Sequence, residues 1–302
     1  MIDFVGKRNW FFLISAILII PGILSLAIFG LKPGVDFSSG TVMTLHLDKE
    51  VDLSQLRQNL NEIGYDRAVI QPAGEGDFLV RVQEMSTEET TKLRNELSQK
   101  LDTEITVSSL YSVSPTIASV TVRNTIIAVI AASIGILLYI SWAFRKMPNP
   151  FRWGICAIIA ILHDLLVVIG IFSILGWAAG VEIDSLFVTG VLAVVGVSVN
   201  NIVVVFDRIR ANSLRHVSKD FAVTVNVGIV ESVGRSLNTG LATLFVIVAM
   251  YLLGGVTIHN LVLTLLIGMA IGIYTSLCFA GQLLVVWDKG FARREKAVTS
   301  PA

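Results

Sequence analysis

The hydrophobic residues of this chain are gathered into long runs that are separated by polar segments. A helix that crosses a lipid bilayer needs about 20 mostly apolar residues, and six runs meet or nearly meet that length. They are Trp10–Phe29, Thr125–Phe144, Trp153–Leu175, Leu186–Phe206, Leu237–Leu253 and Leu261–Trp287. The pattern therefore predicts six transmembrane helices, of which the fifth is short and the sixth is long.

The first run favours a permanent membrane anchor over a signal peptide. A signal peptide has an apolar core of only about 7–15 residues, followed by a cleavage site of small residues. The run that ends at Phe29 is longer than this core, and no such site precedes Lys32. We therefore expect residues 1–30 to form the first transmembrane helix.

Positive charges indicate how the helices are oriented. Lys and Arg residues gather at one set of helix ends: Lys7, Arg8, Arg145, Lys146, Arg152, Arg208, Arg210, Arg215, Lys219, Lys289, Arg293, Arg294 and Lys296. The short loops at the opposite ends, Gly176–Ser185 and Gly254–Asn260, contain none. Because cytoplasmic loops are enriched in Lys and Arg, we expect both termini to be cytoplasmic, with a bundle of five helices over 123–290 and a tail over 291–302.

The long segment between the first two helices, residues 31–122, then faces outward. Its apolar positions alternate over four short stretches and show helical spacing over two others. The expected strands are Thr41–Leu47, Arg67–Gln71, Phe78–Val82 and Glu104–Val113, with helices at Leu53–Ile63 and Thr87–Leu101 and a hairpin turn at Gly74–Asp77. The order β-α-β-β-α-β predicts an extracytoplasmic α+β ferredoxin-like domain. The predicted fold class is thus an integral membrane α-helical bundle of six transmembrane helices that carries one such domain.

The composition excludes a disordered chain, a collagen-like repeat and an ordinary cytosolic enzyme. Hydrophobic residues make up 54% of the chain, charged residues 15%, and the mean hydropathy is +0.74, whereas an average soluble domain contains roughly 25% charged residues. The net charge of zero also argues against a nucleic-acid-binding protein.

Cys156 and Cys278 lie in apolar runs and are therefore predicted to be free thiols. His46 stands alone on an expected strand, so we predict no metal site there.

Two adjacent ionisable residues interrupt the third apolar run. Asp164 lies 11 residues from either end of that run, and therefore near the middle of the membrane, with His163 beside it. Ionisable groups are costly in a bilayer and usually face the interior of a bundle or a water-filled path. Asp164 and His163 are therefore candidates for moving a proton. The alternative is a neutral acid that holds neighbouring helices together by hydrogen bonds.

Small and polar residues recur along the fourth run at helical spacing, which is typical of a helix–helix contact. One face contains Thr189, Ala193, Gly196, Asn200 and Asp207, and the adjacent face contains Gly190, Ser198, Asn201 and Arg208. Asn201 lies about 7.5 Å inside the cytoplasmic end of the helix. Its amide is able to relay or gate a proton but not to carry one. For Asp207, an ion pair with Arg208 and Arg210 at the membrane surface is the favoured interpretation.

A third polar group precedes the fifth run. Arg235 is followed by Asn238 and Thr239 on nearly the same side of a helix. The Arg either anchors the helix at the cytoplasmic surface or pairs with the polar face of the fourth run, and position alone slightly favours the anchor. In the sixth run, Gly268 and Gly272 have the spacing of a close-packing motif.

These residues together resemble the SecF family of protein-export membrane proteins, within the resistance-nodulation-division superfamily. The resemblance covers almost the whole chain. It is carried by Gly34–Thr41 (GVDFSSGT), His163–Asp164, Val199–Arg210 (VNNIVVVFDRIR), Arg235–Thr239 (RSLNT) and Gly254–Gly255. The resemblance implies a protein of the bacterial inner membrane that pairs with SecD, contacts the membrane lipid and acts with the SecYEG translocon. It would use the proton-motive force, without a cofactor, to promote the outward passage of preproteins.

The chain departs from the family pattern at two positions. Family members usually carry an acidic residue at the position of Asn201, and the Arg that matches Arg235 is its usual partner. Three interpretations remain open: a natural variant that couples through Asp164 or through its partner subunit, an engineered substitution, or a subunit that only supports its partner. Ser39 replaces a usual Gly, which predicts a negative φ at this position.

Two other functions compete with protein export. A proton-coupled transporter of small molecules or lipids would use similar helices, but its relatives usually have about twice as many and two large outward domains. A membrane enzyme would need a catalytic cluster, and no H-E-x-x-H, G-x-S-x-G or Walker A motif is present in the sequence. We therefore expect a protein that is not an enzyme.

Overall fold

The computed structural model describes residues 2–49, 51–66, 68–74, 76–145 and 150–288. The chain divides into two compact units. The helical unit contains the first helix and most of the chain after Ala128, and the α+β unit contains Lys32–Ile127 and the short loop Gly180–Ser185. The tail that we expected over 291–302, and Arg67 at the start of an expected strand, lie outside the described residues.

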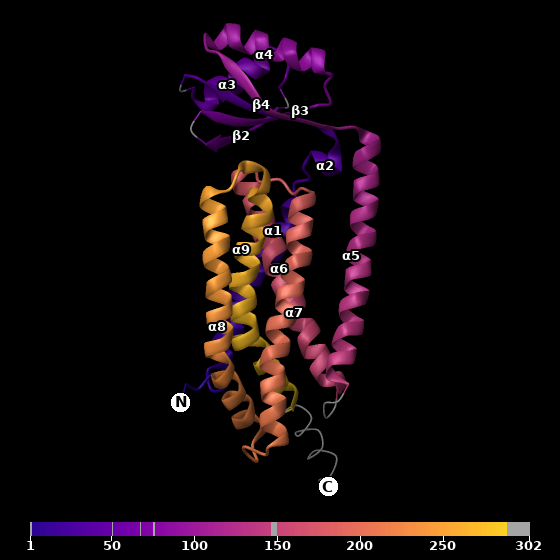
Figure 1. Cartoon of the computed structure of the whole chain (residues 1–302), viewed down its shortest axis with the longest axis vertical. Helices are drawn as coiled ribbons and strands as arrows, with labels where there is room; N and C mark the ends of the chain where they lie inside the picture. The colour runs from indigo at the N-terminus through magenta and orange to yellow at the C-terminus, as the bar shows by residue number, and fades with distance from the viewer. Residues whose placement is uncertain (1, 50, 67, 75, 146–149, 289–302) are drawn as a thin grey trace. The chain divides into compact units, whose positions relative to one another are not determined.

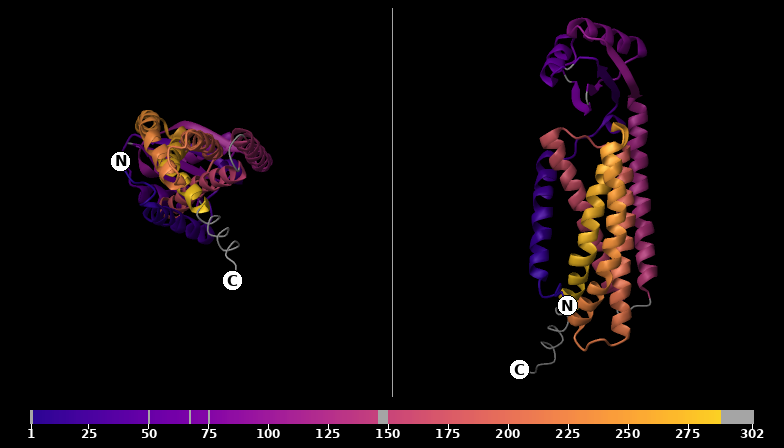
Figure 2. Two further views of the ribbon diagram at one scale, coloured as in Figure 1. Left: turned by 90° about the horizontal axis from the view of Figure 1, so that it is seen from below. Right: turned by 60° about the vertical axis from the view of Figure 1, so that its left-hand side comes forward.

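Six helices are long and apolar enough to cross a membrane, which confirms the six predicted spans. They are α1 (Arg8–Phe29), α5 (Pro115–Phe144), α6 (Pro150–Ala179), α7 (Ser185–Leu214), α8 (Phe221–Leu253) and α9 (His259–Tyr274). The π-helical segment η2 (Thr275–Ala280) follows α9 directly, and the whole span runs from His259 to Asp288. A short 3-10 helix, η1 (Val256–Ile258), precedes α9. Figures 1 and 2 show α6, α7, α8 and α9 running side by side.

The helices extend past the apolar runs, most of all in α8. This helix begins at Phe221 rather than at Leu237, because Asp220 caps it through a hydrogen bond of 2.9 Å from the Ala222 amide to its carboxylate. Large side chains fill the centre of the helical unit: the ring of Trp153 on α6 meets Phe206 on α7 edge to face, with their centroids 5.4 Å apart.

The α+β unit contains one antiparallel sheet in the order β2-β3-β1-β4. Its elements are α2 (Val35–Ser38), β1 (Gly40–Leu47), α3 (Leu53–Glu62), β2 (Val69–Gly74), β3 (Asp77–Val82), α4 (Thr87–Leu101) and β4 (Ile105–Val113). This order confirms the predicted ferredoxin-like pattern. The short helix α2 was not expected from the sequence.

Alternation along the strands places one face of the sheet against α3 and α4. Leu45 on β1, Leu56 on α3 and Leu97 on α4 have no exposed surface and belong to the same core. On the other face His46 is not isolated, because its Nδ1 lies 2.6 Å from Asp77 Oδ1. The histidine that the sequence left alone is therefore paired across the β1–β3 ladder, where it faces Asp77 in the register.

Candidate functional site

Two helices of the helical unit, α6 and α7, bring polar side chains to one glycine of a third helix, α9. Asp164 on α6 and Ser198 on α7 are each 1% exposed. A Cβ built on Gly272 of α9 would lie 3.3 Å from Ser198 Oγ, 3.7 Å from Asn201 Nδ2 and 3.8 Å from Asp164 Oδ2. Residues 164, 201 and 272 are far apart in the sequence, so the fold itself creates this cluster.

His163 connects Asp164 to the last helix. Its Nδ1 lies 3.2 Å from Asp164 Oδ1 and 3.2 Å from Thr275 Oγ1. The His163 ring also packs against Phe279, with their centroids 4.6 Å apart. Thr275 and Phe279 both belong to η2, and π-helical turns of this kind occur frequently at functional sites. The widened turn therefore supplies two of the contacts that position the histidine.

Several polar atoms of this cluster have no hydrogen-bond partner among the described residues. They are Asp164 Oδ2, His163 Nε2, Ser198 Oγ and Asn201 Nδ2. An unsatisfied buried polar group costs about 1–3 kcal/mol, and native proteins usually satisfy such groups with ordered water. Because one of these groups is an ionisable acid inside a membrane-spanning helix, the cluster is a candidate functional site.

Gln282, farther along the last helix, has the same property. It has no exposed surface, and neither its Oε1 nor its Nε2 has a partner in the part of the chain that the structure describes. The sequence did not single out Gln282, Thr275 or Ser198 as site residues. These three residues share one feature in the sequence, because each is a polar side chain inside an apolar run.

The structure places the other predicted site residues outside this cluster. Asn200 and Asp207 on α7, and Arg235, Asn238 and Thr239 on α8, are exposed in this chain. On the face of α7 that contains Asn200, Ala193 and Gly196 are exposed as well. The neighbouring face packs within the chain, because a Cβ on Gly190 would lie 2.8 Å from Thr264 Cβ on α9. Contact of the exposed residues with another chain stays a prediction.

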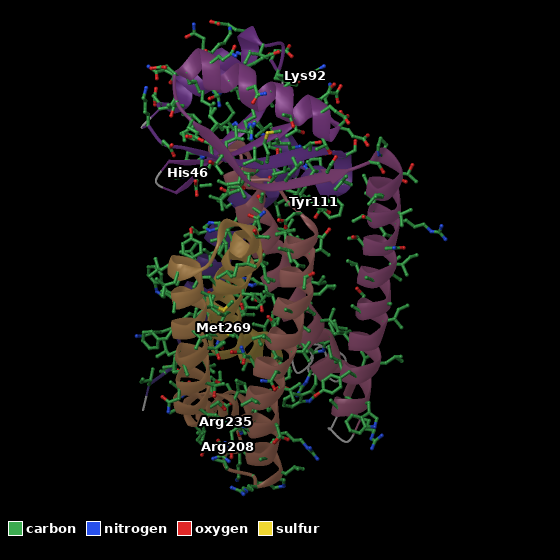
Figure 3. All side chains as sticks on the ribbon, turned by 45° about the horizontal axis from the view of Figure 1, so that its top comes forward. His46, Lys92, Tyr111, Arg208, Arg235 and Met269 are labelled. Carbon is green, nitrogen blue, oxygen red and sulfur yellow. The ribbon has the colours of Figure 1, made fainter. Side chains whose placement is uncertain are left out.

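The charged residues at one end of α7 and α8 pair in an unexpected way. Asp207 lies 3.6 Å from Arg210, as the surface ion pair requires, but Arg208 pairs with Glu231 at 2.8 Å instead. Arg235, one turn of α8 from Glu231, has no hydrogen-bond or ion-pair partner among the described residues. Figure 3 labels Arg208 and Arg235 near the same end of the bundle.

In the α+β unit, the motif Gly34–Thr41 forms hydrogen bonds with the loop between α6 and α7. The Gly34 amide donates to Ile183 O at 2.7 Å, and the Ile183 amide donates to Lys32 O at 2.8 Å. A Cβ on Gly34 would lie 2.7 Å from Ile183 O, so only glycine allows this approach. Asp36 Oδ2 accepts a hydrogen bond of 2.8 Å from the amide of Ser185, the first residue of α7.

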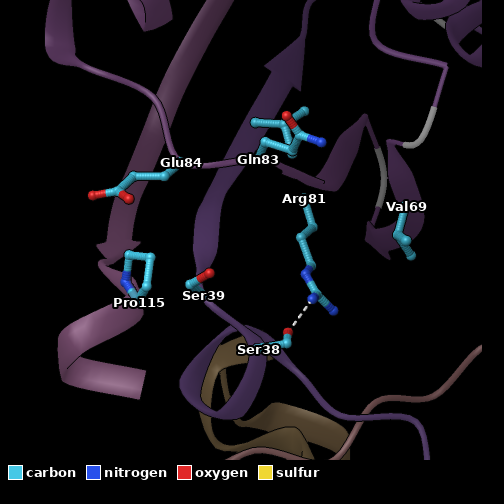
Figure 4. Close-up of a pocket in the computed structure, with 8 residues that line it drawn as sticks. Ser38, Ser39, Val69, Arg81, Gln83, Glu84 and Pro115 are labelled. Carbon is cyan, nitrogen blue, oxygen red and sulfur yellow. Dashed lines mark hydrogen bonds between the residues drawn. The ribbon is translucent and has the colours of Figure 1, made fainter. Parts of the chain in front are cut away.

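Arg81 on β3 strengthens this junction. Its guanidinium lies 2.7 Å from Glu182 Oε2, donates to Pro33 O at 3.0 Å and bonds the Ser38 hydroxyl. Figure 4 shows Arg81 pointing toward Ser38 in a cavity of about 560 Å³. The cavity is lined by Ser38, Ser39, Val69, Arg81, Val82, Gln83, Glu84 and Pro115. Arg81 therefore ties the motif and the loop to the sheet.

The expected backbone conformation of Ser39 was wrong. Ser39 has φ 62° and ψ 163°, a combination that is essentially restricted to glycine. The next residue, Gly40, has φ 135°, and a Cβ there would lie 2.7 Å from Val82 O. The chain must turn sharply from α2 into β1, and this turn requires the unusual conformation whether or not the residue is glycine.

Among the described residues, no three His, Cys, Asp or Glu side chains gather closely enough to hold a metal ion. The polar cluster on α6, α7 and α9 contains one carboxylate, one imidazole, one amide and hydroxyl groups. All of these groups donate or accept hydrogen bonds, and a carboxylate and an imidazole are also able to exchange protons.

Comparison with known proteins places the chain in a family. Residues 93–290 match the family described as "Protein export membrane protein SecD/SecF, C-terminal", and residues 24–51 match the "SecD/SecF GG Motif". The chain is 42% identical to "Protein translocase subunit SecF" of Thermobaculum terrenum, over 97% of this chain and 96% of that protein. The subunit of the same name from Anaerolinea thermophila is 38% identical over 96% and 95% of the two chains.

Longer proteins also contain a region similar to this chain. "Protein translocase subunit SecDF" of Bacillus subtilis is 31% identical over 98% of this chain but only 39% of its own length. The crystal structure of SecDF, "a translocon-associated membrane protein" from Thermus thermophilus, superposes with a TM-score of 0.84 at 29% identity, over 95% of this chain and 39% of that one. The chain thus spans about two fifths of these proteins and, from its sequence and its fold, belongs to the SecD/SecF family of protein-export membrane proteins.

Proposed function

We propose that the chain is an accessory subunit of the Sec protein-export machinery that works with SecD and uses the proton-motive force to promote the outward passage of preproteins through SecYEG. It does so in the bacterial inner membrane without catalysing a chemical reaction. The names of its relatives support the export role. The observation that carries the coupling is the buried Asp164, whose Oδ2 has no partner among the described residues.

Asp164 is the carboxylate of the cluster, and Asn201 is unable to ionise. In the absence of a proton, Asp164 is a buried charge that is only partly satisfied by His163. Protonation removes that charge and changes which helix arrangement is most stable, because a ligand shifts an equilibrium toward the state it binds better. Here the ligand is the proton, and the two states differ in how α6, α7 and α9 surround Asp164.

Chain connectivity provides a route from this site to the α+β domain. Asp164 lies on α6 and Asn201 on α7, and the loop that joins these two helices, Gly180–Ser185, belongs to the compact α+β unit. Gly34, Asp36 and Arg81 hold that loop. A shift of α6 relative to α7 therefore pulls on residues that are bonded to the sheet.

The positions of Lys and Arg support the orientation. The ends of the helices that contain Arg152 and Arg208 carry the positive charges, so these ends and both termini face the cytoplasm. The α+β domain then faces outward, where an exported polypeptide emerges.

SecD is the proposed partner at the exposed polar surface of α7 and α8. This surface consists of Asn200, Arg235, Asn238 and Thr239, all exposed in this chain. An arginine without an acceptor is costly in a membrane. A carboxylate or an amide of SecD would satisfy it, and the fused SecDF relatives show that both parts exist in one polypeptide.

The decisive experiment compares Asp164→Asn with the unchanged protein in proteoliposomes that contain SecD and SecYEG. We expect Asp164→Asn to remove most of the stimulation of export by an imposed pH gradient, because the amide does not exchange a proton. Gly135→Ala, on α5 and with no atom within 4 Å of the added Cβ, is the control. Equal stimulation in all three proteins would rule out Asp164 as the coupling group.

A further inference from the structure

The hydroxyl of Thr275 is bonded to a histidine and not to its own helix. Buried threonines in helices commonly donate to the carbonyl four residues earlier, and Thr264 of the same transmembrane span does so, to Asn260 O at 2.6 Å. Thr275 has no exposed surface, and its Oγ1 lies 3.2 Å from His163 Nδ1 instead. Thr275 is also the first residue of the π-helical segment η2. Its hydroxyl is therefore available to the histidine.

His163 Nδ1 is shared between two oxygen atoms. It lies 3.2 Å from Asp164 Oδ1 and 3.2 Å from Thr275 Oγ1. A neutral imidazole carries a hydrogen on one nitrogen and a lone pair on the other, so Nδ1 either donates or accepts. An ionised Asp164 only accepts, and it requires a hydrogen on Nδ1. A protonated Asp164 removes this requirement, and a bare Nδ1 then accepts the hydroxyl hydrogen of Thr275.

We propose that His163 passes the proton to Asp164 and that Thr275 is the positioning residue that holds the histidine after the transfer. This inference rests on the proposed proton coupling through Asp164. A proton supplied by the gradient forms an N–H bond at His163 Nε2, the N–H bond at Nδ1 breaks, and the released proton forms an O–H bond with Asp164 Oδ1. The pair gains one proton in total, and the Thr275 hydroxyl donates to the emptied Nδ1. Because Nε2 has no hydrogen-bond partner among the described residues, no bond has to break before it is protonated.

Two further titratable side chains lie near this pair. Tyr274 on α9 has its ring centroid 6.4 Å from that of His163, and its hydroxyl donates to Phe11 O on α1 at 2.7 Å. Cys278 of η2 is a free thiol that interacts with Tyr274. Since the Tyr274 hydrogen is donated to α1, Thr275 is the hydroxyl that serves Nδ1. The polar neighbours that do not ionise are Ser15 on α1, beside Tyr274, and Ser198 and Asn201 on α7, which face Gly272 together with Asp164.

The position of the hydrogen on the His163 ring tests the transfer directly. The histidines of this chain are labelled with ¹⁵N, the chain is reconstituted with unlabelled SecD, and NMR spectra distinguish ring nitrogens with and without a hydrogen. The signal lost in His163→Gln identifies His163. Spectra are recorded at one pH where the infrared C=O band of the Asp164 carboxylic acid, identified by its loss in Asp164→Asn, is absent and at one where it is present. We expect the hydrogen on Nδ1 at the first pH and on Nε2 at the second.

Thr275→Val tests the positioning role, because it removes the hydroxyl and keeps nearly the same shape. We expect the hydrogen to stay on Nδ1 at both pH values. We also expect proton flux under an imposed pH gradient to fall about fivefold, the factor that one ordinary hydrogen bond supplies. Thr275→Ser keeps the hydroxyl and should restore both properties. Thr264→Val makes the same change where the hydroxyl bonds to its own helix, and is the matched control.

Each outcome decides one part of the proposal. If His163 in the unchanged protein keeps one tautomer at both pH values, or carries hydrogens on both nitrogens at the lower pH, the transfer is refuted whether or not Thr275→Val folds. If Thr275→Val matches Thr264→Val in flux and in tautomer, Thr275 does not position the histidine. In both cases a loss of flux in Asp164→Asn leaves the proposed function intact. If Asp164→Asn keeps the flux, the proposed function itself fails.

Discussion

Gly22 of α1 and Gly170 of α6 meet backbone to backbone, so that a Cβ on Gly170 would lie 2.6 Å from Gly22 Cα. Close to this crossing, Ser25 Oγ lies 2.9 Å from Ser173 Oγ. Small residues allow helices to approach closely in membranes, and hydrogen bonds across the contact add to the stability. This crossing attaches the first helix to the helix that carries Asp164.

Gly170→Ala should therefore destabilise the helical unit. The added methyl group meets backbone atoms that are unable to yield without separating the helices, so we expect a loss of about 1–3 kcal/mol in the free energy of unfolding. Thermal unfolding in mild detergent measures it. Gly135→Ala, whose Cβ meets nothing within 4 Å, controls for the change in helix propensity. A loss of the same size in both variants would contradict the importance of the crossing.

Ser39→Gly should have the opposite effect on the α+β domain. A residue other than glycine in this conformation is strained by about 1–3 kcal/mol, and the extra freedom of glycine in the unfolded chain offsets about 0.4–1 kcal/mol of the relief. We expect a net gain of about 1 kcal/mol in stability. Ser39→Ala keeps the strain and serves as the control. A gain in Ser39→Ala, or none in Ser39→Gly, would show that the backbone is not strained here.

The start of α4 predicts a dependence on pH. Ser86 and Glu89 form a reciprocal capping box, and the hydrogen bond from the Ser86 amide, followed by that from its side chain, lowers the pKa of Glu89 below its usual 4.5. A carboxyl with a lowered pKa in the folded state contributes stability above about pH 4.5, and this contribution is lost as the pH falls through the folded-state value.

Ser86→Ala should weaken this dependence. We expect it to destabilise the domain by about 1 kcal/mol near neutral pH and to reduce the slope of stability against pH below about pH 4.5. Unfolding midpoints measured on both sides of that pH are sufficient to test it. Thr91→Ala, which alters an exposed hydroxyl of the same helix without touching the cap, is the control. Curves for Ser86→Ala and the unchanged protein that coincide would refute the role of the cap.

Asn201→Asp restores the acidic residue that is usual in the family. Asn201 and Asp164 both face Gly272, so a second carboxylate there adds a like charge and a second group that binds a proton. We expect export in proteoliposomes to depend more steeply on the imposed pH gradient. Asn124→Asp, at an exposed position of α5 outside the proposed SecD surface, is the matched control. An unchanged dependence in Asn201→Asp would show that this position does not take part in coupling.

Much of the architecture follows from local sequence patterns. Runs of about 20 apolar residues have one stable solution in a membrane, because a helix satisfies its own backbone hydrogen bonds. Alternation along Thr41–Leu47 and Phe78–Val82 likewise determined which residues of the sheet meet α3 and α4. The same cost of burying charge identified Asp164 before any neighbour was known.

Other features depended on residues that are distant in sequence. The sequence pointed to a negative φ at Ser39, but the turn into β1 imposed the opposite sign. It marked two adjacent faces of α7 as contact surfaces, and within this chain the Gly190 face packs against α9 while Asn200 on the other face is exposed. Helical spacing shows that two faces differ, whereas only the neighbouring helices decide which of them is covered.

The sequence alone therefore determined the number of helices, the class of the small domain and the presence of a buried acid, since these depend on the balance between burial and solvation along short stretches of chain. Only the tertiary structure decided that Asp164, Ser198 and Asn201 converge on Gly272 and that the α6–α7 loop is held by Gly34 and Arg81. Such meetings depend on helix crossings and on close backbone approach, which no local pattern encodes.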